Sequence, residues 1–135
     1  MPVNLSYPKP RDVLTKVVAI ARTDSSTEKC VLPKGAFITN IRILQVDNAA
    51  TAAGTFSLGW SGATTALVNA FSMATTKVGL VNAGTNIGTV AGAGTQLDSD
   101  KMVISTYTVG SSTAGGTGYV FIEYFMPAPG EGIAD

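Results

Sequence analysis

The sequence TFSLGW, residues 55–60, decides the fold class of this chain. Phe56, Leu58 and Trp60 alternate there with threonine, serine and glycine. Successive side chains of a β-strand point to opposite faces of the sheet, so this period of two is expected where one face is buried. The segment therefore predicts a strand that places Trp60 in a hydrophobic core.

Similar segments lie on both sides of it, rich in β-branched or aromatic residues and bounded by turn formers. They predict strands at residues 13–23, 28–32, 36–47, 77–81, 101–109 and 119–126. A Pro-Lys-Gly turn at 33–35 predicts that the strands on either side of it form a hairpin-like pair, and the last two strands are expected to pair antiparallel. Roughly seven or eight short strands with little helix predict an all-β protein, an antiparallel β-sandwich or jelly roll.

One short helix is expected among these strands. Leu67, Ala70 and Phe71 stand at positions i, i+3 and i+4, the spacing that aligns side chains on one face of a helix, so a helix is predicted over 66–73. Residues 82–96 are rich in glycine, whose backbone freedom makes regular structure costly, and a long loop is predicted there.

The 135 residues fit one domain with one core. Three prolines within residues 1–12 deny backbone donors and favour extended conformations, which predicts an N-terminal arm. Residues 13–126 are expected to form the single β-sandwich domain. Prolines and glycines end the last strand and predict a C-terminal tail over 127–135.

Composition narrows the possible functions. Nine basic and nine acidic side chains cancel, which disfavours generic binding to nucleic acid or to an anionic membrane surface. There is no histidine, the commonest metal ligand and the usual acid–base group near neutral pH. A single cysteine, Cys30, no signal-peptide pattern and no apolar stretch of ~20 residues predict a soluble protein made in the cytoplasm.

Charge is unevenly distributed along the chain. Residues 1–42 carry seven basic and three acidic groups, a net charge of +4, whereas residues 48–97 contain Lys77 as their only charged residue. Surfaces of free monomers usually carry mixed charges over about a quarter of their residues, so the charge-poor stretch is interpreted as surface covered by partners. The alternative is a neutral, loop-rich surface that hydroxyl groups keep in solution.

Motifs that carry chemistry are missing from the sequence. The segment Gly59-Trp60-Ser61-Gly62 lacks the spacing of a nucleophile elbow, and no phosphate-binding loop occurs. Asp98 and Asp100 are interpreted as a polar turn rather than as a cation site, because calcium needs about six or more oxygen ligands. Glu123 either pairs with a basic group or lies at a solvated position, and the solvated position is commoner. We therefore expect no enzymatic activity, no cofactor and no metal.

Four aromatic residues raise one further possibility. Trp60, Tyr107, Tyr119 and Tyr124 would suit a sugar-binding platform if they were exposed together. Because Trp60 alternates in phase with Phe56 and Leu58, the core is the preferred location for it.

Three short segments carry a resemblance to a known group of proteins. They are VLPKGAFITNI at 31–41, TFSLGWSG at 55–62 and TALVNA at 65–70. Together they resemble small structural proteins of tailed bacteriophages, in which a Leu-Pro-x-Gly-Ala turn leads into a strand. The resemblance implies a capsid decoration (cement) protein on the virion exterior, often a homotrimer, bound to the major capsid protein and carrying no catalytic residue. Head-fibre or tail-fibre components and carbohydrate-binding modules remain alternatives.

Partner contacts are predicted in the arm. Prolines stiffen an extended segment and lower the entropy lost when it docks, while basic groups meet acidic surface on a partner. The predicted partner-binding residues are Tyr7, Pro8, Lys9, Pro10 and Arg11. The alternative is a frayed terminus without a role.

Overall fold

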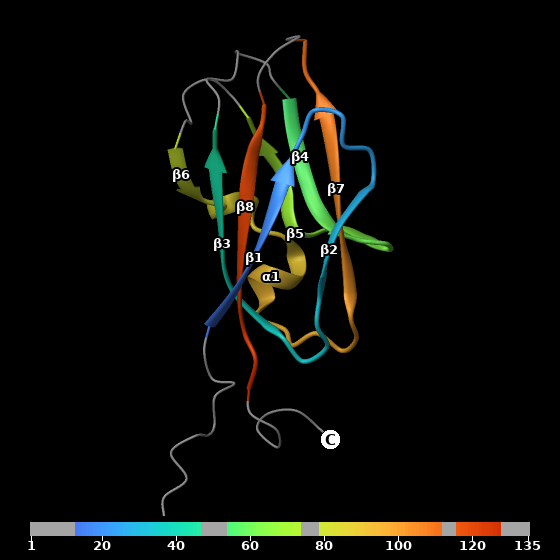
Figure 1. The fold of residues 1–135 in the computed structure, drawn as a ribbon, viewed down its shortest axis with the longest axis vertical. Helices are drawn as coiled ribbons and strands as arrows, with labels where there is room; N and C mark the ends of the chain where they lie inside the picture. The colour runs from blue at the N-terminus through green and yellow to red at the C-terminus, as the bar shows by residue number, and fades with distance from the viewer. Residues whose placement is uncertain (1–12, 47–53, 74–78, 112–115, 128–135) are drawn as a thin grey trace, which may run out of the picture.

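The computed structural model describes residues 13–46, 54–73, 79–111 and 116–127. Two four-stranded antiparallel sheets face each other (Figure 1). The strands are β1 (Val13–Ile20), β2 (Thr27–Leu32), β3 (Phe37–Gln45), β4 (Gly54–Trp60), β5 (Ala63–Ser72), β6 (Gly79–Asn82), β7 (Lys101–Val109) and β8 (Gly118–Phe125). The predicted all-β sandwich is confirmed.

The strand order identifies the type of sandwich. The first sheet has the order β1-β8-β3-β6 and the second has the order β2-β7-β4-β5. The chain changes sheet at nearly every connection, and only β4 and β5 are neighbours both in sequence and in a sheet. This order is that of an eight-stranded jelly roll.

The core lies between the two sheets and is built by the alternation seen in the sequence. Phe56 and Leu58 on β4 are almost completely buried, and Trp60 is 8% exposed, as predicted. Phe56 packs against Phe71 of β5 with ring centroids 5.8 Å apart. The first sheet supplies the opposite wall, with Val18, Ile20, Ile41, Ile43, Val120, Ile122 and Tyr124.

Two predicted strand pairings are wrong. β2 and β3 do not form a hairpin, because β2 lies in the second sheet and β3 in the first. β7 and β8 are likewise in different sheets: β7 lies between β2 and β4, and β8 lies between β1 and β3. The turn signals were correct as chain reversals, but each connection crosses the ~10 Å between facing sheets instead of returning along the same sheet.

The predicted helix over 66–73 is also wrong, because residues 66–72 belong to β5. The register between β4 and β5 shifts twice, and Ala70 adopts a positive φ of 50°. These irregularities put Ala66, Leu67 and Val68 in the core in succession. A bulged strand therefore imitates the spacing of a helix.

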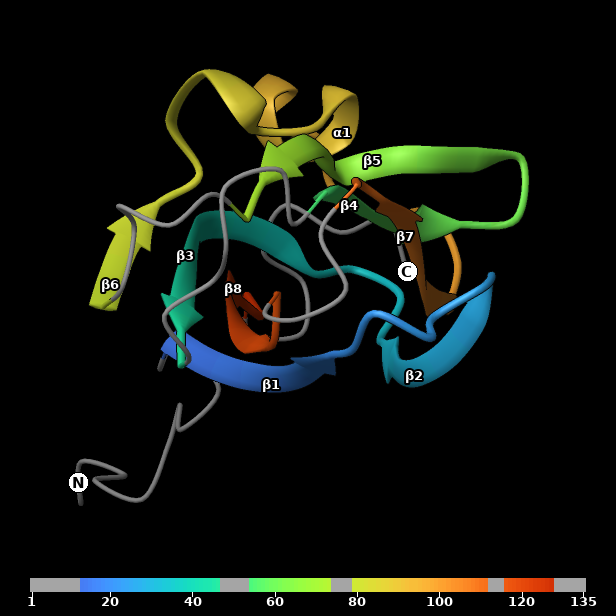
Figure 2. The ribbon, with the colours of Figure 1, turned by 90° about the horizontal axis from the view of Figure 1, so that it is seen from above.

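The short helix lies instead inside the predicted loop, at α1 (Thr89–Ala93), preceded by the 3-10 turn η2 (Gly84–Asn86). At Gly88, which precedes α1, a Cβ atom would lie 2.2 Å from the carbonyl oxygen of Thr65, so only glycine allows this approach to β5. Ala91 is buried, and α1 packs beside β5 on the side of the sandwich opposite β1 (Figure 2).

The predicted arm at 1–12 lies outside the described residues, as does the predicted tail at 127–135 except for Pro127, which is buried. The division of the chain into an arm, a domain over 13–126 and a tail stays a prediction.

Replacing Trp60 by alanine should lower the free energy of unfolding by about 3–5 kcal/mol, because it removes a large buried aromatic side chain. Met102→Ala is the control, since Met102 lines the same cavity as Trp60 but is 40% exposed, so its removal should lower the free energy of unfolding much less. Chemical denaturation followed by circular dichroism measures both. Equal losses in the two variants would contradict the core position of Trp60.

Candidate functional site

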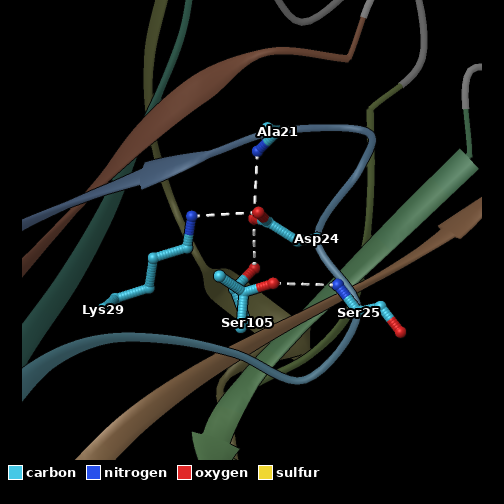
Figure 3. A network of polar contacts seen from close by, with 6 residues as sticks. Ala21, Asp24, Ser25, Lys29 and Ser105 are labelled. Atoms are coloured by element: carbon cyan, nitrogen blue, oxygen red, sulfur yellow. Dashed lines mark hydrogen bonds and ion pairs between the residues drawn. The ribbon is translucent and has the colours of Figure 1, made fainter.

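The most organised polar cluster surrounds Asp24, in the crossing between β1 and β2 (Figure 3). Asp24 is 5% exposed. Its Oδ2 atom accepts hydrogen bonds from the backbone N–H of Ala21 at 3.0 Å and from the hydroxyl of Ser105 at 2.8 Å. Its Oδ1 atom pairs with the ammonium group of Lys29 at 2.9 Å. The buried carboxylate thus has partners on β2, on β7 and in the crossing itself.

This cluster anchors the crossing to the second sheet. The backbone N–H of Tyr107 donates to the carbonyl of Asp24 at 3.0 Å, and Asp24 N–H donates to the carbonyl of Ala21 at 3.0 Å. A buried carboxylate is costly without partners, and here both oxygens are engaged. In the sequence, Asp24 is only one of the turn formers that bound the predicted strands, because Lys29 and Ser105 are brought to it by the fold.

The carboxylates considered from the sequence do not converge. Asp98 is exposed and pairs with Lys101 at 3.2 Å, and this hydrogen bond holds the pKa of Asp98 below its ordinary value. Asp100 accepts a hydrogen bond from the backbone N–H of Lys34 at 2.8 Å. The described residues contain no cluster of three or more groups suited to a metal ion. Asp98 and Asp100 both belong to a polar turn before β7, as the sequence predicted.

Glu123 is not at a solvated position, which corrects the commoner expectation for it. It forms an ion pair with Arg42 of the neighbouring strand β3, and its side chain is 20% exposed. Residues 81 positions apart meet because β8 inserts beside β3.

A shallow cavity of about 280 Å³ lies beside Trp60. It is lined by Glu28, Trp60, Ser61, Asp100, Lys101, Met102 and Ile104. The Lys101 ammonium lies 5.5 Å from the centre of the Trp60 ring, in a cation–π contact. Lys101 therefore occupies the position that a stacking ligand would take.

The four aromatic residues proposed for a sugar platform are not exposed together. Trp60, Tyr107 and Tyr124 are buried in the core, whereas Tyr119 is 41% exposed on the first sheet. Trp60, Tyr107 and Tyr124 therefore pack in the core.

Burial explains only part of the lack of charge in residues 48–97, because more of the described residues in this stretch are exposed than buried. Within its described residues, β4 and β5 supply much of the second sheet's contribution to the core. Charged side chains would be costly there. Burial therefore accounts for the lack of charge at the buried positions of β4 and β5, and not at the exposed described positions of the stretch.

Cys30 is a free thiol on β2 and is half-buried. Burial raises its pKa above the ordinary value of 9.0, and the nearby charge of Lys16 opposes this only in part. The thiol is therefore protonated, and a weak nucleophile, at neutral pH.

The predicted partner-binding residues lie outside the described residues. These are Tyr7, Pro8, Lys9, Pro10 and Arg11. Among the described residues, no helix has both the length and the apolar character needed to cross a membrane.

Comparison with known proteins adds a likeness of fold. No protein-family model matches the chain, and no curated protein matches it in sequence. Among solved structures, a chain described as "Cyanophage Pam1 capsid asymmetric unit" is similar, with a TM-score of 0.64 and 19% sequence identity. The likeness covers 94% of this chain and 94% of the other. At this identity it shows a shared fold.

The role of Asp24 can be tested with one substitution. Asp24→Asn keeps the size of the side chain but removes its charge and turns one acceptor into a donor, so the free energy of unfolding should fall by about 1–3 kcal/mol. Asp98→Asn is the matched control, because it removes an exposed carboxylate paired with Lys101, and its unfolding midpoint should not change. Equal midpoints for the two variants in thermal denaturation would show that the Asp24 cluster does not stabilise the fold.

Proposed function

We propose that this chain is a structural protein of a bacteriophage capsid, attached to the outside of the shell as a decoration, or cement, protein. The observation that carries the proposal is the jelly-roll fold, which is similar over 94% of both chains to a chain described as part of a cyanophage capsid asymmetric unit. The sequence segments at 31–41, 55–62 and 65–70 point to the same class of phage structural protein.

The charged groups of the described residues fit a protein that works by binding rather than by catalysis. Asp24 is held by three donors, and Glu123 is paired with Arg42. Groups fixed in this way stabilise strand crossings and strand pairs. We therefore propose no catalytic residue and no cofactor.

Attachment is proposed to use the arm at residues 1–12. Its prolines limit the entropy lost on docking, and Lys9 and Arg11 would be drawn to acidic surface on the major capsid protein. The β-sandwich would then project from the shell as a homotrimer. Synthesis in the host cytoplasm accords with the free thiol of Cys30.

The proposed function predicts binding to preformed shells. Purified chain added to capsids assembled without it should bind until a fixed number of copies per particle is reached, because the lattice offers a limited set of equivalent sites. Quantitative mass spectrometry and cryo-electron microscopy of the particles measure the number and the position. Density confined to the tail or to head fibres would assign the chain to a fibre instead, and absence from the particles would refute a virion role.

The arm predicts a separate outcome. Deleting residues 2–11 should leave the thermal unfolding midpoint nearly unchanged, because the described sandwich begins at Val13, yet capsid occupancy should be lost. Lys9→Ser with Arg11→Ser serves as a milder variant, whose association should slow and depend less on salt. Full occupancy after the deletion would show that the arm is a frayed terminus.

A further inference from the structure

The outer face of the first sheet carries more large apolar side chains than the outer face of the second, where Val31 and Met102, each 40% exposed, lie opposite each other. In β7, Val103, Ser105 and Tyr107 point into the core, so Thr106 and Thr108 point outward. Their neighbours on β4 are small and polar, since Thr106 lies opposite Ser57 and Thr108 opposite Thr55. An antiparallel sheet with one solvated face is expected to be polar there, and this part of the second sheet follows the rule.

The first sheet does not follow it. Its buried residues alternate with outward ones that the strand register aligns in rows across β1, β8, β3 and β6. We call this surface the outer apolar face. Its rows are Val13–Phe125–Phe37, Thr15–Glu123–Asn40, Val17–Phe121–Arg42–Asn82 and Ala19–Tyr119–Leu44–Leu80.

Large apolar side chains on this face are in contact with water. Val13 is 56% exposed, Val17 54%, Leu80 52% and Tyr119 41%, and Phe121 and Phe125 are only half-buried. The four most exposed residues come from three strands of one sheet: β1 and β8 are adjacent, and β6 is the opposite edge strand, separated from β8 by β3. Contiguous exposed apolar surface of this kind marks a binding site for another macromolecule.

Charge on the outer apolar face is balanced internally. Arg42 and Glu123 lie on neighbouring strands within it and pair with each other, so the face presents no net charge from its one cation and one anion. A charged partner surface, positive or negative, would gain little electrostatic attraction from this face. A second neutral, apolar surface can cover it without burying an unpaired charge. The outer apolar face of a second copy of this chain is a surface that is both neutral and apolar.

The size of the face fits such an interface. The four strands have 8, 8, 9 and 4 residues. At ~3.3 Å per residue along a strand and ~4.8 Å between strands, they cover roughly 460 Å² of flat area, not counting the relief of the side chains. A stable interface buries about 800 Å² on each partner, which is the same order. Two sheet faces pack against each other at ~10 Å through interdigitating side chains, as they do inside a sandwich.

We propose that the outer apolar face is a self-association surface, through which copies of this chain pack with the β1-β8-β3-β6 sheet turned toward a shared symmetry axis. A closed symmetric assembly brings the same patch of each copy to that axis. The proposal concerns contacts between copies of the free protein and does not depend on the capsid role.

The test compares two valines of equal exposure. Val17 lies on the outer apolar face and Val109 lies at the end of β7 in the second sheet, and both are 54% exposed. Val17→Glu places a charge at the proposed contact, so the dissociation constant for self-association of this variant should be at least tenfold higher than that of the unchanged protein. Val109→Glu should associate as the unchanged protein does. Sedimentation velocity over a range of micromolar concentrations measures both, and circular dichroism with thermal denaturation verifies folding.

A second substitution covers the case in which Val17→Glu does not fold. Leu80→Glu lies on β6, at the opposite side of the same face, and is 52% exposed in the unchanged protein. It should also weaken self-association at least tenfold. The proposal is overturned if the unchanged protein is monomeric at 100 μM (about a hundredfold above the ~1 μM constant of a moderately stable complex), or if folded face variants associate as tightly as Val109→Glu.

Capsid binding separates this proposal from the proposed function. A monomeric protein whose Tyr119 becomes protected only on particles would assign the outer apolar face to the capsid protein and overturn self-association. A protein that associates through this face but does not bind capsids would retain the self-association surface and refute the decoration role.

Discussion

The insertion of β8 between β1 and β3 is the constraint on which the rest of the structure depends. β8 is the last strand among the described residues, yet it is central in its sheet and pairs on both sides along its full length. Val120, Ile122 and Tyr124 then form the middle of that sheet's inner wall. The first sheet cannot close until the C-terminal strand arrives, and the second cannot bury its apolar face until the first is complete. Non-local pairing of this kind makes folding slow compared with that of proteins rich in local contacts.

The jelly-roll strand order requires the chain to cross between the sheets, and the buried carboxylate of Asp24 lies at one of these crossings. A chain that changes sheet at nearly every connection must carry backbone polar groups over the ends of the core. At the β1–β2 crossing, Asp24 meets that need by accepting hydrogen bonds from the crossing and from β7, while Lys29 neutralises it. The same non-local pairing places Glu123 beside Arg42 on the outer apolar face. Two acidic residues from distant parts of the sequence thereby become structural, and the described residues offer no site at which several carboxylates converge.

The proposals assign different tasks to different parts of the chain. The inner faces of both sheets make the core, the outer apolar face would join copies to one another, and the arm would attach the assembly to a shell. Such a separation has a physical advantage, because an apolar sheet face gives a rigid contact and a proline-rich arm gives a docking segment of low entropy cost. It also places each task on a surface that can be altered without disturbing the others.

The sequence alone determined the fold class, the approximate position of every strand except β5 and the burial of Trp60, because a period of two depends only on the geometry of the extended chain and on the burial of one face. It also indicated that Asp98 and Asp100 form a turn. Only the tertiary structure decided which strands pair, that residues 63–72 form a bulged strand and residues 89–93 a helix, and that Asp24 and Glu123 have the partners they have. Those outcomes depend on which strands bury each other's apolar faces across ~10 Å, and local sequence patterns hold no information about contacts between residues some eighty positions apart.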